Sequence, residues 1–423
     1  MAALPPLPEW LQMEHRVAHI LTEQEQHGWY FDERAAWELA SSLRSELESI
    51  DALLRRRYPL VPGQRFTPKR DNKSKGYVAG AEFTRLKEFN PTSRDHIAWI
   101  LKTHSGWEPT SLTPTGKPIV DETSLKDIGT DLALSFLRML EITKMLGMLS
   151  EGKNAWLKLV TKSKRIHHHC SVATNTGRCA HRHPNLAQTP SDERFRQLFT
   201  ATPEEVMVGA DLSGVELRML AHYLSRFDEG RYAHILITGD IHQTNADKIG
   251  ISRKLVKTVT YAFLYGAGDA KIGLSYDKSL SSSAAKSKGK EIRKAYVEAI
   301  PGLADLLTAV QTASDRGYVK TIDGRRLNVD SSHKALNFLL QGSSACLAKR
   351  WLLIANDGVK TMPLCASQLA FVHDELQYEC APEHAEDLKF LLELSAVQAG
   401  EYYNLRCPIA AEGKIGKTWA DVH

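Results

Sequence analysis

The fold is decided by residues 206–224, VMVGADLSGVELRMLAHYL, an apolar run that reaches a carboxylate and then takes on helical spacing. Residues 369–380, LAFVHDELQYEC, form a second apolar run that ends in carboxylates. The two aspartates concerned are Asp211 and Asp374. A carboxylate at the end of a buried strand is costly unless a cation or hydrogen bonds offset it. Alone, Asp211 would be interpreted as a helix cap, but the pair predicts a site for magnesium, which takes few protein oxygens.

A basic and aromatic segment lies between these two runs. Residues 252–268, SRKLVKTVTYAFLYGAG, predict a helix with Ser252 as its N-cap and Gly266 and Gly268 at its end. Steps of four residues drift by only about 40° at 3.6 residues per turn. One slowly winding stripe therefore carries Arg253, Lys257, Tyr261 and Tyr265. Cations suit a triphosphate and rings suit a sugar and base, so with the carboxylates the pattern indicates nucleotidyl transfer.

Histidines occur at two further places. His242, in DIHQ at 240–243, could hydrogen-bond a phosphate, and a purely structural role is an equal alternative. The run His167, His168, His169 and Cys170 looks like a metal cluster. Adjacent residues on a strand point to opposite faces, so these histidines cannot all bind one ion, and we do not expect a metal there.

Composition limits the classes of protein. At 423 residues the chain is long enough for several subdomains. Its net charge is only +4, so a nucleic-acid surface must be local, with candidates near Arg55–Arg57 and Arg65–Lys75. The six cysteines form no C-x-x-C pair, which favours reduced thiols in a cytoplasmic protein. We find no signal peptide and no apolar run long enough to span a bilayer.

Periodicity predicts an α+β protein. Helical spacing covers residues 13–57, with a break at Gly28, and returns after Pro91, over 133–160, 215–225, 227–310, 333–359 and 382–403. Strands and turns are expected over 165–190, and hairpins at Asp323-Gly324 and around Asp374. Three stretches are predicted to lack regular structure: a basic loop at about 60–76, a turn-rich region at 109–129 and a Ser/Lys-rich interruption at 277–290.

At these residues the chain resembles family A DNA polymerases, the bacterial DNA polymerase I family, and within it the replicative enzymes of short-tailed, T-odd-type phages. The motifs that carry the resemblance are DLSGVELR (211–218), RKLVKTVTYAFLYGAG (253–268) and VHDE (372–375). Further matches are residues 174–190 and 333–345, and residues 14–32 and 89–97 resemble the thumb of the phage enzymes. The resemblance covers nearly the whole chain in order. It implies a right-hand polymerase with the thumb at 1–165, palm at 166–223 and 337–423, and fingers at 224–336.

The resemblance also implies roles for individual residues. Two magnesium ions, for which manganese can substitute, would be held by Asp211, Asp374 and the Leu212 carbonyl, with Glu375 as a supporting carboxylate. The nucleoside triphosphate would be bound by His242, Arg253, Lys257, Tyr261 and Tyr265. Glu216 would be a steric gate against ribose, and a tyrosine at position 261 is linked to acceptance of dideoxynucleotides. Primer-template DNA would contact Arg178, Gln341, His373 and Asn337.

Two departures from the phage pattern affect the expected activity and partners. No acidic exonuclease motifs precede the thumb-like residues, so we expect no intrinsic proofreading, and a separate exonuclease subunit or processivity factor becomes a candidate partner. In one phage enzyme type a long thumb insertion recruits host thioredoxin. The matching region here, about Leu60–Lys87, is much shorter, which does not favour thioredoxin. The expected location is the cytoplasm, that of the host cell for a viral protein.

Two alternatives remain open at this point. A single-subunit phage-type RNA polymerase shares the Asp, Arg, Lys and Tyr pattern, but Glu216 and Glu375 argue against it. A non-catalytic DNA-binding subunit derived from a polymerase is the other alternative, and the intact Asp211, Lys257 and Asp374 argue against that one.

Overall fold

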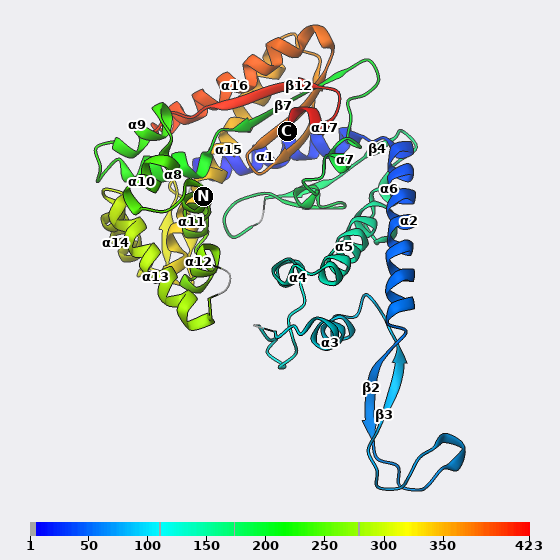
Figure 1. Ribbon diagram of the computed structural model, residues 1–423. Helices are drawn as coiled ribbons and strands as arrows, with labels where there is room; N and C mark the ends of the chain where they lie inside the picture. Colours follow the sequence, from blue (N-terminus) through cyan, green and yellow to red (C-terminus); the bar gives the residue numbers. More distant parts are fainter. Residues whose placement is uncertain (1–5, 110, 173, 278–279) are drawn as a thin grey trace, which may run out of the picture. The chain divides into compact units, whose positions relative to one another are not determined.

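The computed structural model describes residues 6–109, 111–172, 174–277 and 280–423 (Figure 1). The chain divides into two compact units, one made of residues 1–32 and 159–423 and the other of residues 33–158. The larger unit contains the first helix and residues 159–165. The assignment of thumb, palm and fingers itself stays a prediction. None of the helices in the described ranges has both the length and the apolar character of a membrane span.

A four-stranded antiparallel sheet organises the larger unit. Its order is β10 (Ala366–Val372), β11 (Glu375–Cys380), β7 (Val206–Leu212) and β12 (Ala411–Gly416). Strand β7 is therefore central, and its residues Met207, Val208 and Ala210 are buried. Helix α16 (Ala385–Tyr402) packs against β7 and β12, and α1 (Glu9–His27) packs against β10 (Figure 1). Both predicted carboxylate segments are thus strands of one sheet.

Helices follow the sheet along most of the remaining chain. Helix α8 (Val215–Leu224) comes directly after β7, and α15 (Ala335–Thr361) packs against α1, α8 and α16. Between them lie α9 (Arg231–Thr238), α10 (Ile241–Ile249), α11 (Arg253–Leu264), α12 (Asp269–Tyr276), α13 (Ser282–Ala299) and α14 (Leu303–Ser314). A large apolar core runs through this unit, and its largest buried side chains include Trp351, Tyr296 and Tyr378.

Short elements complete the larger unit. They are β1 (Trp29–Tyr30) paired with β4 (Arg165–Ile166), β5 (His169–Ser171) with β6 (Ala180–Arg182), β8 (Tyr318–Lys320) with β9 (Arg326–Asn328), and helices α7 (Glu193–Arg196) and α17 (Trp419–Val422). The predicted hairpin at Asp323-Gly324 is confirmed by the β8–β9 pairing, and Gly324 has the positive φ of 81° that its turn requires.

The smaller unit is mainly helical and has its own core. It contains α2 (Glu33–Arg57), α3 (Arg94–Ser105), α4 (Glu122–Ile128), α5 (Asp131–Leu146), a π-helical turn (Gly147–Glu151) and most of α6 (Trp156–Leu159). The hairpin of β2 (Leu60–Phe66) and β3 (Phe83–Glu88) follows α2. Helix α3 begins soon after Pro91, and the Ser93 hydroxyl caps it by accepting a hydrogen bond from the His96 amide.

The structure corrects three predictions of irregular chain. The basic loop at about 60–76 begins instead as strand β2, because Val61 is buried in the core of the smaller unit and pairs with Lys87 of β3. The proline and glycine are accommodated by a register shift between Pro62 and Arg65. The turn-rich region at 109–129, in which Thr110 lies outside the described residues, contains α4, which is stabilised by a capping box between Asp121 and Ser124.

The third correction concerns the Ser/Lys-rich interruption at 277–290, where residues 278–279 lie outside the described residues. Helix α13 begins already at Ser282, and the Ser281 hydroxyl accepts a hydrogen bond from the Ala284 amide. The small residues of this stretch pack against α12. A β-carbon at Gly289 would lie 1.7 Å from the Asp269 carbonyl oxygen, so glycine permits a close helix–helix contact.

Candidate active site

Asp211 and Asp374 lie at the same end of neighbouring strands. Strand β7 pairs antiparallel with β11, and Asp211 is directly opposite Glu375. Asp374 occupies the β10–β11 turn, where its carbonyl accepts a hydrogen bond from the Leu212 amide at 3.0 Å. His373 adopts a positive φ of 60° in that turn. The sequence-predicted pair is therefore brought together, with Leu212 adjacent to both.

The electrostatics of this pair are those of a cation site. Burial, followed by the charges of Asp374 and Glu375, raises the pKa of Asp211 to about 7. Because the Asp211 side chain still reaches solvent, we attribute the raised pKa of Asp211 more to charge repulsion between the carboxylates than to burial. Burial, followed by the charge of Glu216, raises the pKa of Asp374 to about 6. In the described part of the chain neither aspartate forms an ion pair with a lysine or arginine.

Glu375 is held differently from the two aspartates. It is buried and accepts hydrogen bonds from Trp419 Nε1 at 2.6 Å and from Gln377 Nε2, with His423 Nδ1 at 3.2 Å from its second oxygen. These contacts tie it to α17 and to its own strand. Its charge contributes to the raised pKa of Asp211, the residue opposite it on β7.

Helix α11 presents the predicted stripe. The Ser252 hydroxyl caps it by accepting from the Leu255 amide, and Val256, Val259 and Phe263 on the opposite face are buried. Arg253 and Lys257 lie on the exposed face. Arg253 Nε donates to Asp240 Oδ2 at 2.7 Å. Asp240 also caps α10, because its side chain accepts a hydrogen bond from the Gln243 amide. In this segment the sequence pattern indicates only His242 as a site residue, although an aspartate directly before a helical segment is a typical N-cap.

Tyr265 joins the end of this helix to α8. It follows the last helical residue, and its hydroxyl donates to Glu216 Oε1 at 3.1 Å. Arg178 donates to the same oxygen at 2.9 Å. Tyr261 stacks on Tyr265 with ring centroids 6.4 Å apart. Burial and the adjacent Glu216 carboxylate raise the pKa of Tyr265 to about 12, so its hydroxyl stays a donor. Three segments distant in sequence thus converge on Glu216.

The remaining predicted residues border this network at different depths. His242 is buried, 6.3 Å from the Tyr261 ring, and burial lowers its pKa. Asn337 on α15 donates to the Leu264 carbonyl at 3.0 Å, which ties α15 to the end of α11. Gln341 lies one turn further along α15 and is half-buried. Burial also lowers the pKa of His373, whose Nδ1 has no hydrogen-bond partner among the described residues.

A sheet with paired carboxylates, faced by a helix of cations and aromatic rings, defines a nucleotide-polymerising enzyme. The model of DNA polymerase family A matches residues 70–421. Two relatives are the DNA-directed DNA polymerases of Escherichia phage T7, 34% identical, and Enterobacteria phage T3, 33% identical, and each match covers 98% of this chain and 70% of the relative. This chain belongs to DNA polymerase family A and is a DNA-directed DNA polymerase.

A solved structure agrees with this assignment at the level of the fold. The POL domain of Pol1 from M. smegmatis, described in complex with DNA primer-template and dNTP, matches with a TM-score of 0.78. It is 22% identical, and the match covers 97% of this chain and 70% of that one. The predicted α+β polymerase fold is confirmed.

Proposed function

We propose that this enzyme carries out template-directed DNA synthesis in phage-type replication by a two-metal mechanism. The 3′-hydroxyl of a primer attacks the α-phosphate of a deoxynucleoside triphosphate, which forms a phosphodiester bond and breaks the bond to the leaving pyrophosphate. The observation that carries the proposal is the pair Asp211 and Asp374 at adjacent strand ends, which have raised pKa values and form no ion pair with a lysine or arginine among the described residues.

The donor set fits two magnesium ions, with manganese as a substitute. Hard divalent cations prefer carboxylate and carbonyl oxygens, and Asp211, Asp374 and the Leu212 carbonyl would supply them. When bound, the ions neutralise the charge of the triphosphate and lower the pKa of the primer hydroxyl. A cation also accounts for the cost of placing these carboxylates close together.

The cations of α11 would bind the triphosphate. Lys257 is exposed and one turn from Arg253, so both can reach neighbouring phosphates. Arg253 would exchange its ion pair with Asp240 for a phosphate, and Lys257, unpaired among the described residues, would stabilise the negative charge on the leaving pyrophosphate. His242, behind Tyr261, would donate a further hydrogen bond to the triphosphate.

Glu216 would select deoxyribose. Its carboxylate is fixed by Arg178 and Tyr265, so it cannot move aside without breaking two hydrogen bonds. A rigid group beneath the sugar excludes a 2′-hydroxyl by steric conflict. Tyr261, stacked on Tyr265, would lie near the 3′ position of the incoming sugar, where a tyrosine is expected to permit dideoxynucleotides.

Contacts to DNA complete the proposal. The primer end or the minor groove would be contacted by Arg178, Gln341, His373 and Asn337. The hydrogen-bond acceptors in the minor groove are common to all base pairs, so such contacts sense the geometry of a pair rather than its sequence. In right-hand terms, residues 1–165 would form the thumb, 224–336 the fingers, and 166–223 with 337–423 the palm.

We further propose that these 423 residues do not remove a mispaired 3′-terminal nucleotide from a primer. Steady, metal-dependent loss of such a nucleotide by the purified chain would show the opposite.

Primer extension tests the proposal. The substrate is a labelled primer on a DNA template, with magnesium and either deoxy- or ribonucleotides. Extension with deoxynucleotides is expected for wild type and for the exposed-site control Asp315→Ala, and is expected to be lost in Asp211→Ala and Asp374→Asn.

Other results point to other functions. A preference for ribonucleotides would favour an RNA polymerase. Equal inactivity of wild type and Asp374→Asn, with DNA binding intact in both, would favour a non-catalytic subunit and refute the mechanism.

A further inference from the structure

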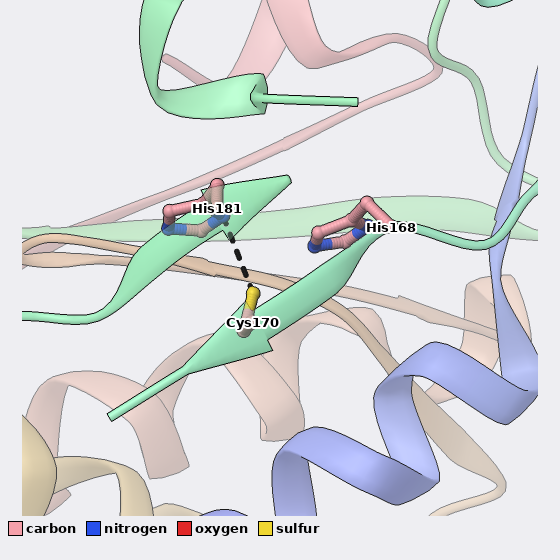
Figure 2. Close-up of side chains that lie close together, drawn as sticks. All are labelled: His168, Cys170 and His181. Atoms are coloured by element: carbon pink, nitrogen blue, oxygen red, sulfur yellow. Dashed lines mark hydrogen bonds between the residues drawn. The ribbon is translucent and has the colours of Figure 1, made fainter. Parts of the chain in front are cut away.

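A second group of metal-ligand side chains lies outside the polymerase site. Cys170 on β5 and His181 on β6 are directly opposite each other in the antiparallel pair, and His168 precedes Cys170 by two residues. One potential ligand atom from each of the three lies within 4.8 Å of the others (Figure 2). All three residues are buried, with exposed fractions of 0% for His168 and 7% for Cys170 and His181.

Strand alternation explains why this group differs from the histidine run of the sequence. His167 Nδ1 hydrogen-bonds the Glu25 carbonyl oxygen and His169 Nδ1 the Glu25 carboxylate, so these two histidines are engaged elsewhere. The prediction that the adjacent histidines cannot all share one ion is confirmed. It overlooked that residues two apart share a face, and that a paired strand can supply the third ligand.

Two ring nitrogens face the other members of the group. His168 Nε2 lies 3.0 Å from Gln24 Nε2, and His181 Nδ1 lies 3.2 Å from Cys170 Sγ. The other ring nitrogens, His168 Nδ1 and His181 Nε2, have no hydrogen-bond partner among the described residues, and they would carry the ring protons when the facing nitrogens bind a cation.

The spacing is close to that of a tetrahedral zinc site. Zn–N bonds of about 2.0 Å and a Zn–S bond of about 2.3 Å place tetrahedral ligand atoms roughly 3.3 Å (N to N) and 3.5 Å (N to S) apart. Cys170 Sγ and His181 Nδ1 are 3.2 Å apart (dashed line in Figure 2). A separation at the 4.8 Å limit would have to shorten by roughly 1.3–1.5 Å.

Gln24 can supply the fourth ligand. In the structure its Nε2 contacts both His168 Nε2 at 3.0 Å and Cys170 Sγ at 3.6 Å, so the amide already faces the group. Its Oε1 accepts from Gln368 Nε2, and Gln368 Oε1 accepts from the Tyr378 hydroxyl. If the amide groups of Gln24 and Gln368 are both turned by 180°, Gln24 Nε2 donates to Gln368 Oε1 and Gln368 Nε2 donates to the Tyr378 oxygen. The Gln24 oxygen then points toward the cation. Oxygen and nitrogen of an amide are assigned from such networks.

We infer that His168, Cys170 and His181, with Gln24, form a structural site for one zinc-class divalent cation, separate from the polymerase carboxylates. The ion would link α1, β5 and β6. The His181 ring is 6.3 Å from the ring of His373, the neighbour of Asp374, so the site would also brace the turn that positions that aspartate. Binding would release the Cys170 proton to solvent.

Zinc and cobalt titrations of the purified full chain, after removal of metal by a chelator, test this inference. All proteins carry Asp211→Ala, so that cations at the polymerase carboxylates do not contribute. One equivalent of zinc is expected to bind in competition with a chromogenic chelator. Cobalt is expected to give the intense thiolate-to-metal absorption of a tetrahedral cysteine site, and zinc X-ray absorption should show one sulfur near 2.3 Å.

Variants locate the site. Cys170→Ala is expected to lose the zinc equivalent and the thiolate absorption, and zinc should no longer raise its melting temperature. His169→Asn, on the other face of the strand, and Cys179→Ser, a buried thiol outside the group, should retain all three signals. Absence of sulfur from the zinc spectrum, or retention of full binding by Cys170→Ala, overturns the inference. The sulfur measurement needs only Asp211→Ala, so it decides even if Cys170→Ala fails to fold.

Discussion

Replacing Glu14 by glutamine is expected to destabilise the larger unit strongly. Glu14 on α1 is the common partner of two buried cations: Lys349 Nζ lies 2.8 and 2.6 Å from its two oxygens, and Arg325 also donates to it. Lys349 is only 1% exposed. The Arg325 guanidinium retains Asp323 at 2.7 Å, whereas Lys349 has no other ion-pair partner among the described residues. The substitution leaves an uncompensated buried ammonium.

The magnitude follows from that loss. Removing one partner of a buried ion pair costs about 3–5 kcal/mol, because the remaining charge stays out of water. The total stability of a domain is about 5–15 kcal/mol, so this is a large fraction. Urea unfolding, followed through the transition of the larger unit, measures the change. Pairing Glu14→Gln with Lys349→Met should recover part of it, since the double variant buries no unpaired charge.

The same two helices provide a matched control. Arg16 on α1 and Asp357 on α15 form an ion pair at 2.6 Å, but their side chains are 50% and 53% exposed. Arg16→Gln should therefore cost at most about 1 kcal/mol. If Glu14→Gln proved no more destabilising than Arg16→Gln, or if the double variant were simply additive, the reasoning from burial would be refuted.

Three further predictions follow from other contacts. Gly289→Ala should destabilise the protein by about 1–3 kcal/mol or more in thermal unfolding, because its methyl group would collide with the Asp269 carbonyl, whereas exposed Ser287→Ala in the same helix should be neutral. Magnesium affinity, measured by calorimetry, should fall as pH drops through about 7 and 6, because protons on Asp211 and Asp374 compete with the metal, and a pH-independent affinity would contradict this. In the metal-free protein, Asp374→Asn should lower the pKa of Asp211 in a carboxyl NMR titration, since a neighbouring negative charge is removed. An unchanged pKa would show that the charge of Asp374 does not contribute to it.

The parts of this enzyme that sequence predicts best are those with strong local patterns. The buried run before Asp211 indicated β7, and Ser252 with the four-residue stripe indicated α11. Local patterns could not show where distant residues meet. Arg178 and Tyr265 both donate to one oxygen of Glu216, and nothing in the sequence spacing of these residues predicts that contact.

Errors arose where tertiary contacts override composition. Proline, glycine and lysine suggested a loop at 60–76, but burial of Val61 and a partner strand made β2. Serine and lysine suggested a break at 277–290, but close packing on α12 favours helix there. Pairing of β5 with β6 brought His181 to Cys170, which no feature of residues 167–170 alone could reveal.

The central place of β7 has a consequence for synthesis of the chain in the cell. Both neighbours of β7 in the sheet are translated late, since β11 begins at residue 375 and β12 ends at residue 416. At about 5–20 residues per second, roughly 10–40 seconds separate the emergence of Leu212 from that of Gly416. During that interval an apolar strand with two unpaired edges is exposed to pairing with other nascent chains. Slower translation of the last 200 or so residues should therefore increase aggregation, and a chaperone that shields β7 should improve the yield of active enzyme.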